Sequence, residues 1–235
     1  MLIPNFLYRE KILPMYNSTV ANKDFDEGSI LEGLPLMVDF KKEDALLPNP
    51  ELLEFYNDLK NRVLYIDDDI VDPMAMEVQR LIVAWNREDA GIPAEERKPI
   101  KVMIYTCGGS VYAMNNIIDV IMMSKTPVYT YNVGIAFSAG LDILLAGQKR
   151  FCFPKSSALL HQGANVIQGT SVQVQDNADN YKRQLKEYEE WVLSRTKITK
   201  ALYTKKKKNE WFLTAQEQVE LGVVDAMVQD LDEIL

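Results

Sequence analysis

The sequence predicts an α/β fold, built from repeated βαβ units around a mostly parallel sheet. Short apolar runs that are typical of buried strands alternate with segments in which apolar residues recur at helical spacing. Glycines mark two of the turns that lead from such a strand into a helix. With 235 residues, of which 47% are hydrophobic, the chain is long enough to bury a full core, as one large domain or as one domain with an appendage.

The chain is predicted to divide near residue 50. Residues 1–50 show no sustained periodicity, contain five prolines and mix acidic clusters with short apolar patches. We interpret them as an N-terminal extension or arm, and we expect residues 51–235 to form the folded domain.

The first part of this domain is predicted to run strand, helix, strand, helix. Residues 63–66 form a short buried strand, and Asp72 and Pro73 supply an N-cap and a first-turn proline for the helix that follows. Residues 102–106 form the next strand, which turns at a glycine pair into the second helix. Both helices carry an apolar face: Val78, Leu81, Ile82 and Trp85 in the first, and Met114, Ile117, Ile118 and Ile121 in the second.

The same alternation continues along the chain. Residues 128–133 form a third strand, Ser138 begins another helix, and residues 150–153 and 158–161 return to extended structure. Because short strands alternate with helices, this order favours βαβ units and therefore parallel pairing of the strands.

The last third is predicted to start with a long amphipathic helix of about 22 residues, roughly 33 Å in length. Its apolar face either packs within the fold or protrudes into a partner subunit. After this helix, residues 211–217 lead into a short helix with Thr214 and Glu217 as a capping box, and residues 223–228 form a strand. The apolar face of the long helix consists of Val174, Ala178, Tyr181, Leu185, Tyr188 and Val192.

Composition and charge exclude several classes of function. The formal net charge of −8 argues against a nucleic-acid binder, and the one strongly basic run, residues 205–208, is interpreted as a solvated face. The most apolar region, residues 121–147, is interrupted by charges and a proline, so we expect no membrane-spanning segment. Cys107 and Cys152 lie in apolar, strand-like contexts without metal-ligand spacing, which fits a reducing cytoplasm better than a disulfide scaffold. We expect neither a metal site nor a cofactor.

The candidate chemistry centres on the single histidine, His161. Ser138 lies 23 residues earlier in a run of small residues, and a serine hydroxyl becomes a good nucleophile when a neighbouring imidazole takes its proton. The alternative is a satisfied core histidine, since His161 lies in an apolar stretch. Two glycine-flanked turns offer backbone donors: Gly109 brings its N–H close to a ligand, and Ala139 lies at a helix N-terminus, where a developing oxyanion is favoured.

Taken in order, these segments resemble the proteolytic subunit of the Clp protease over about residues 55–230. The resemblance implies a crotonase-like α/β fold and two stacked heptameric rings of subunits, with Ser-His-Asp peptidase sites facing an enclosed chamber. It also implies unfolded polypeptides as substrates, delivered by an ATP-driven unfoldase of the AAA+ class. The segments that carry it are Gly108 to Ser110, residues 134–140, residues 149–154, His161 and Gln162, Gln168 and Gly169, and residues 212–225.

Carried over by position, the resemblance implies Ser138 as nucleophile and His161 as general base. It implies the N–H groups of Gly109 and Ala139 as the oxyanion hole. Where the family has its third member, an aspartate, this chain has Glu210, which is either the orienting carboxylate or a solvated charge in a lysine-rich loop.

Two other functions are compatible with the sequence. One is that of a catalytically impaired ring subunit with a structural or regulatory role. The substituted carboxylate favours this alternative, and the retained Ser138 and His161 oppose it. A third possibility is an acyl-CoA enzyme of the crotonase superfamily, which shares the fold and an oxyanion hole of two backbone N–H groups but requires no Ser-His pair.

Overall fold

The computed structural model describes residues 50–163 and 166–234, so the predicted N-terminal extension, apart from Pro50, lies outside the described residues. The first described helix begins at Pro50, next to the predicted boundary. In chain order the elements are α3 (Pro50–Asn61), β1 (Val63–Ile66), α4 (Asp72–Glu88), η3 (Ala94–Glu96), β2 (Ile100–Thr106), α5 (Val111–Met123), β3 (Val128–Phe137), α6 (Ala139–Ala146), β4 (Lys149–Cys152), β5 (Ser157–Leu160), α7 (Ser171–Arg195), α8 (Lys200–Lys206), β6 (Trp211–Thr214), α9 (Ala215–Glu220), β7 (Ala226–Met227) and η4 (Leu231–Glu233).

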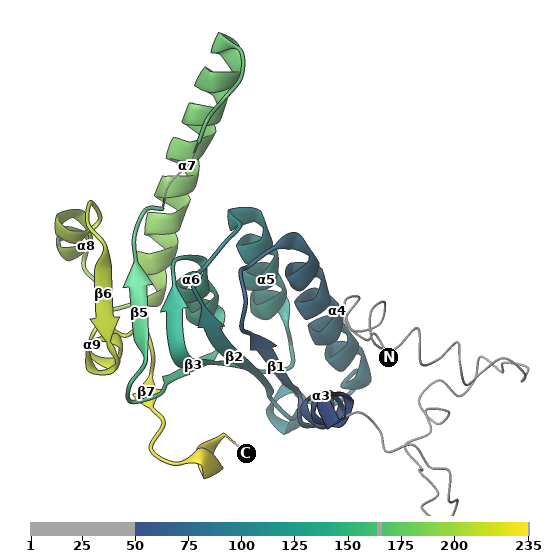
Figure 1. Ribbon diagram of the computed structural model, residues 1–235. Coiled ribbons are helices and arrows are strands. Elements are labelled where there is room, and N and C mark those ends of the chain that lie inside the picture. Colours follow the sequence, from purple (N-terminus) through teal and green to yellow (C-terminus); the bar gives the residue numbers. More distant parts are fainter. Residues whose placement is uncertain (1–49, 164–165, 235) are drawn as a thin grey trace, which may run out of the picture.

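The predicted α/β class is confirmed. The described strands form one sheet in which β1, β2, β3, β4 and β7 follow one another in parallel, and β5 pairs with β3 and β6. Strand β3 is the centre of this arrangement, because residues 129–132 pair with β4 and residues 135–137 pair with β5. Only the pairing of β5 with β6 is antiparallel among the described strands. Helices α4, α5 and α6 lie together on one side of the sheet (Figure 1).

The two faces of the sheet carry cores of different size. Along β2, Val102 and Ile104 are fully buried in the main core, which includes the apolar residues of α4, α5 and α6. Met103 points to the other face and joins a smaller cluster with Tyr131 and Val228. This period of two is the geometry of a strand buried on both faces. Ile234, near the C-terminus, packs against the smaller cluster.

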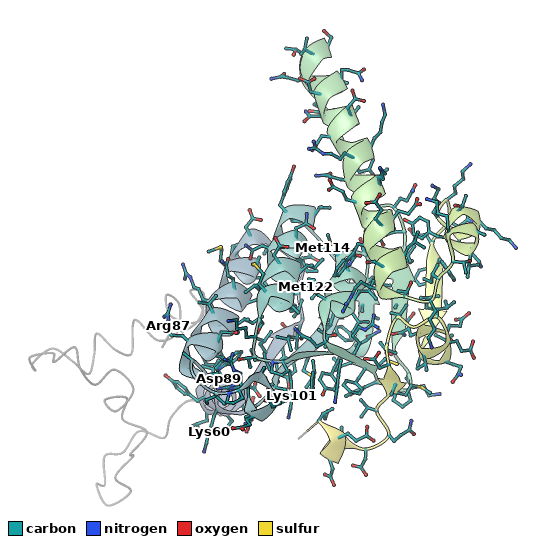
Figure 2. All side chains as sticks on the ribbon, turned by 180° about the vertical axis from the view of Figure 1, so that it is seen from behind. Lys60, Arg87, Asp89, Lys101, Met114 and Met122 are labelled. Carbon is teal, nitrogen blue, oxygen red and sulfur yellow. The ribbon has the colours of Figure 1, made fainter. Side chains whose placement is uncertain are left out.

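Helix α7 extends well beyond the rest of the domain (Figure 1). Its C-terminal half packs against α6, where Val192 is buried and Glu189 forms ion pairs with Lys200 and Lys207. Residues 171–177 are all exposed, and side chains stand out from this end of the helix on all sides (Figure 2). The apolar face predicted for this helix therefore packs within the fold in its C-terminal half, whereas no described residue covers it in its N-terminal half.

Two local predictions about element ends are wrong. Asp72 is not the N-cap of α4: the N-cap is Val71, because the Val71 carbonyl accepts the first helical hydrogen bond, from Ala75 N–H at 3.1 Å. Residues 223–228 are not one strand, since β7 is limited to Ala226–Met227. The N–H groups of residues 223 and 224 instead donate to the carbonyl of Gln218 and close the end of α9.

Other predictions need smaller corrections. Strand β3 extends to Phe137, so it reaches Ser138 directly. Cys107 follows β2 in a loop and is exposed, whereas Cys152 is buried at the end of β4. The run 205–208 is not wholly solvated, because Lys206 stacks over the ring of Trp211 and Lys207 pairs with Glu189. Helices α3 and α8 and strand β6 were not predicted, whereas the Thr214–Glu217 capping box is confirmed. No helix in the described part of the chain is both long and apolar enough to cross a membrane.

Candidate active site

Four of the five predicted site residues follow parallel strands that are neighbours in the sheet. Gly109 follows β2. Ser138 and Ala139 follow β3, and His161 follows β5. Strand β3 pairs with both β2 and β5, and the carboxyl ends of parallel strands meet at one edge, where α/β sheets bind ligands. The four residues line one cavity of about 390 Å³.

Ser138 joins β3 to α6 in an unusual backbone conformation. Its φ of 54° and ψ of −122° lie outside the regions that residues with a Cβ prefer. Its N–H donates to the Leu159 carbonyl of β5 at 3.0 Å, which ties the turn to the strand that precedes His161. Strained turns of this kind are concentrated at functional sites, where they expose a side chain between a strand and a helix.

The glycine turn after β2 packs directly against the Ser138 turn. A Cβ on Gly108 would lie 2.8 Å from the Cβ of Ser138, and a Cβ on Gly109 would overlap the backbone of Ile70. Both positions therefore need glycine. Two backbone–backbone hydrogen bonds hold the turn, from Ile70 N–H to the Gly108 carbonyl at 2.9 Å and from Ser110 N–H to the Ile70 carbonyl at 2.8 Å.

The N–H groups of Gly109 and Ala139 remain available to a ligand. Neither group donates a hydrogen bond to another residue in the described part of the chain. Ala139 is also the first residue of α6, where unpaired N–H groups carry the positive end of the helix dipole. Two such donors beside a serine hydroxyl are suited to stabilise a negative charge that develops on a carbonyl oxygen.

Glu210 approaches His161 because of the register between β5 and β6. These strands are antiparallel, and Leu160 lies opposite Trp211. The next position along each strand therefore brings His161 opposite Glu210, and their Nδ1 and Oε1 atoms are 3.2 Å apart. The Glu210 side chain is 59% exposed and that of His161 is 26% exposed, so the contact lies at the rim of the domain.

The other nitrogen of His161 has no partner among the described residues. Its Nε2 atom is buried and makes no hydrogen bond to any described residue, and this includes the Oγ of Ser138. Hydrogen bonds between a base and its nucleophile frequently tighten only when substrate binds. The arrangement thus combines a serine at a strained turn, an imidazole with one free nitrogen and a carboxylate on the other. Within residues 50–163 and 166–234, no group of three or more His, Cys, Asp or Glu side chains is arranged to hold a metal ion.

The walls of the cavity were not predicted. Helix α7 supplies one wall, anchored by a hydrogen bond from Tyr181 OH to the Gln162 carbonyl at 3.1 Å. Helix α5 supplies Met114 and Ile118, and α6 supplies Asp142. The sequence signal for Asp142 was a charged residue inside the otherwise apolar run of α6. This signal alone does not indicate a cavity, because the cavity depends on how the helices pack.

Comparison with known proteins identifies a family. Residues 49–230 match the family model described as Clp protease. The ATP-dependent Clp protease proteolytic subunit 1 of Bacillus cereus is 29% identical over 173 residues, which cover 73% of this chain and 86% of that protein. The corresponding subunit 1 of Rhodopirellula baltica is 30% identical over 172 residues, which cover 72% of this chain and 73% of that protein. Subunit 1 of Corynebacterium jeikeium is 27% identical over 177 residues, which cover 74% of this chain and 91% of that protein. The range matched by the family model includes all five predicted site residues.

Proposed function

The chain belongs to the Clp protease family, and on this basis we propose that it is a serine endopeptidase subunit. The observation that supports this most directly is the common cavity of Ser138, His161, Gly109 and Ala139. Each group has the chemical property that acyl transfer requires, namely a nucleophile, a base and two backbone donors.

The proposed reaction uses these groups in two steps. Ser138 Oγ attacks the peptide carbonyl while His161 Nε2 takes its proton, and the N–H groups of Gly109 and Ala139 stabilise the oxyanion. The imidazolium then gives the proton to the leaving amine, which leaves an acyl ester on Ser138. Water attacks that ester in the second step with His161 again as base, which regenerates the free serine. Glu210 accepts a hydrogen bond from His161 Nδ1–H, which keeps Nε2 unprotonated and stabilises the imidazolium.

The contact of Glu210 also weighs against the impaired ring subunit. That alternative depends on glutamate being a poor replacement for aspartate. The longer side chain nevertheless comes within 3.2 Å of the imidazole. The acyl-CoA alternative leaves this contact without a role, because it needs only the two backbone donors.

We further propose that the subunit acts in a ring assembly with an AAA+ unfoldase, and that it cleaves unfolded polypeptides in the cytoplasm. Its relatives are named as proteolytic subunits of ATP-dependent proteases. The exposed end of α7, which carries Val172 and Val174, offers an apolar surface for a second subunit. We propose a homo-oligomer of two stacked heptameric rings.

The test is covalent labelling combined with peptide cleavage. A fluorophosphonate should add its mass to the wild type and to the control Ser171→Ala, in which a serine outside the cavity is removed, but not to Ser138→Ala or His161→Ala. Cleavage of short fluorogenic peptides should follow the same pattern, whereas a folded protein should be degraded only with an unfoldase and ATP. Peptide cleavage that persists in pure Ser138→Ala would refute the mechanism. Absence of label on an intact assembly would favour the impaired subunit, and CoA binding without peptide turnover would favour the acyl-CoA enzyme.

A further inference from the structure

A buried acid lies beneath the candidate nucleophile. Asp142 is one turn along α6 from Ser138, and its N–H donates to the Ser138 carbonyl at 3.3 Å. Asp142 lines the same cavity as Ser138 and His161. The residue is 2% exposed, and its Oδ1 atom is buried without a hydrogen-bond partner among the described residues.

An unpaired carboxyl group at this position destabilises the fold. Burial raises the pKa of Asp142 well above its ordinary value, and an apolar residue would pack there without this penalty. The neighbours of Asp142 in α6, Leu141 and Ile143, are apolar and fully buried. An acid in such a helix, facing a cavity, is typical of a functional group.

The rest of the cavity is suited to a cation. Glu187 is the other acidic residue in its lining, and no lysine or arginine of the described residues lines it. Tyr188 also lines the cavity, and its hydroxyl is buried without a partner among the described residues and has lone pairs to accept a hydrogen bond. Met114, Ile118 and Leu185 provide apolar walls. Such a lining is suited to a long basic side chain, whose methylene stem packs against the apolar walls and whose charged group lies at the end of the cavity.

We propose that this cavity takes the substrate side chain on the acyl side of the scissile bond, and that Asp142 selects lysine or arginine there. The proposal rests on the proposed peptidase function, because it names the substrates of the same site. Asp142 lies four residues beyond Ser138, a rise of about 6 Å along the helix, and the four-carbon stem of lysine spans such a distance. When the cation enters, the Asp142 carboxyl group gives its proton to solvent water and forms an ion pair with the cation, and no bond between heavy atoms changes.

The first experiment compares two peptides that differ only at this residue, one with lysine and one with leucine. The wild type should prefer the lysyl peptide in kcat/KM. In Asp142→Asn the lysine-to-leucine ratio should fall by about 30-fold or more, because a buried charge pair loses one partner. Asp119→Asn is the matched control, since it makes the same change from carboxyl to amide at a residue of α5 that lines a different cavity. Its ratio should equal that of the wild type. A leucine preference in the wild type, a glutaminyl peptide that exceeds the lysyl one, or an equal ratio in Asp142→Asn would overturn the proposal.

The second experiment does not depend on catalysis. Butylamine is the side chain of lysine without its backbone, and it should raise the unfolding temperature of the wild type and of Asp119→Asn but not of Asp142→Asn. Butanol, which lacks the charge, should have no such effect. Binding of butylamine without peptide turnover would reject the peptidase function and retain the cation site. Peptide turnover without lysine preference and without butylamine binding would reject the cation site and retain the peptidase.

Discussion

The proposed role of Glu210 depends on a single contact, the 3.2 Å approach of its Oε1 to His161 Nδ1. An amide in place of the carboxylate no longer stabilises the imidazolium and favours the wrong tautomer of His161. Glu210→Gln should therefore lower kcat by up to about 10⁴-fold while the assembly remains intact. The measurement is peptide turnover, with sedimentation to verify assembly.

A matched control for Glu210 is Glu190→Gln on α7. Glu190 is also exposed, and its ion pair with Lys186 lies away from the cavity. It should keep normal turnover. If Glu210→Gln does so as well, Glu210 is only a surface charge.

Asp142 should make the stability of the protein depend on pH. Its folded pKa lies above its unfolded value of about 3.9, so the unfolded chain releases this proton at a lower pH than the folded protein does. The unfolded state then binds fewer protons, and stability falls as pH rises, by about 1.4 kcal/mol per pH unit between the two pKa values. The phenols that interact with Asp142 stay neutral in this range, because burial raises the pKa of Tyr203 to about 12 and that of Tyr188 well above its usual value.

Asp142→Asn removes this titration without a change of shape. The free energy of unfolding of the variant, relative to the wild type, should therefore increase as the pH is raised from about 4 toward neutrality. Urea denaturation across this range measures it. A difference that is constant with pH would mean that Asp142 ionises equally well in the folded protein.

At the scale of elements, α7 has two halves with different surroundings. Leu185 lines the candidate active-site cavity and belongs to the half that packs on the domain, so a substitution there would perturb the candidate site itself. Val172 and Val174 lie in the projecting half and are 67% and 38% exposed. The predicted contact between subunits is therefore best tested in that half.

Val174→Glu should yield a folded protein of smaller assembly size. A charge placed in an apolar seam between subunits lacks a partner and costs several kcal/mol. Asn177→Glu adds the same charge to the same exposed half of the helix at a polar position, and it should keep the wild-type size in sedimentation. An unchanged particle in Val174→Glu would place this face outside the subunit contact, and a monomeric wild type would exclude the ring assembly.

At the scale of the whole molecule, one buried ion pair joins segments that are distant in sequence. Asp89, at the end of α4, accepts hydrogen bonds from Arg62 at 2.6 and 2.7 Å and from the Thr126 hydroxyl at 2.7 Å. Figure 2 labels Asp89 at the end of the domain where Lys60 of α3 also lies. Hydrogen bonds from Arg62 lower the pKa of Asp89. Its contribution to stability is therefore present above the unfolded pKa of about 3.9 and is lost as the pH falls through the folded value.

Asp89→Ala should destabilise the protein by about 3–5 kcal/mol at neutral pH, because it leaves the Arg62 guanidinium buried without its partner. Glu88→Ala is the control: Glu88 also lies near Arg62, at 3.6 Å, but its side chain is 55% exposed. That change should cost no more than about 1 kcal/mol. Equal effects of the two substitutions in urea denaturation would contradict the special role of the buried pair.

The sequence by itself determined the α/β class and most of the helices and strands, and it led to the proposal that Ser138 and His161 act together. These features depend on local signals: apolar residues recur at helical spacing around Ile82 and Ile117, and His161 has no competitor in the chain. Helix α8 and strand β6 escaped prediction because they are short, with seven and four residues. Helix α3 spans 12 residues and lies between the predicted boundary near residue 50 and the first predicted strand.

Only the tertiary structure decided which side chains meet. Glu210 contacts His161 across 49 residues of sequence because β5 and β6 pair in one antiparallel register, which no local pattern specifies. Asp142 interrupts an apolar run in the sequence, but the packing of α5 and α7 around α6 makes it the acid of a cavity. Apolar residues recur at the same heptad spacing in the projecting end and in the buried end of α7. Only one end is buried, because the helix extends beyond the part of the domain against which it packs. Periodicity identifies a face, whereas its burial depends on contacts between residues far apart in the chain.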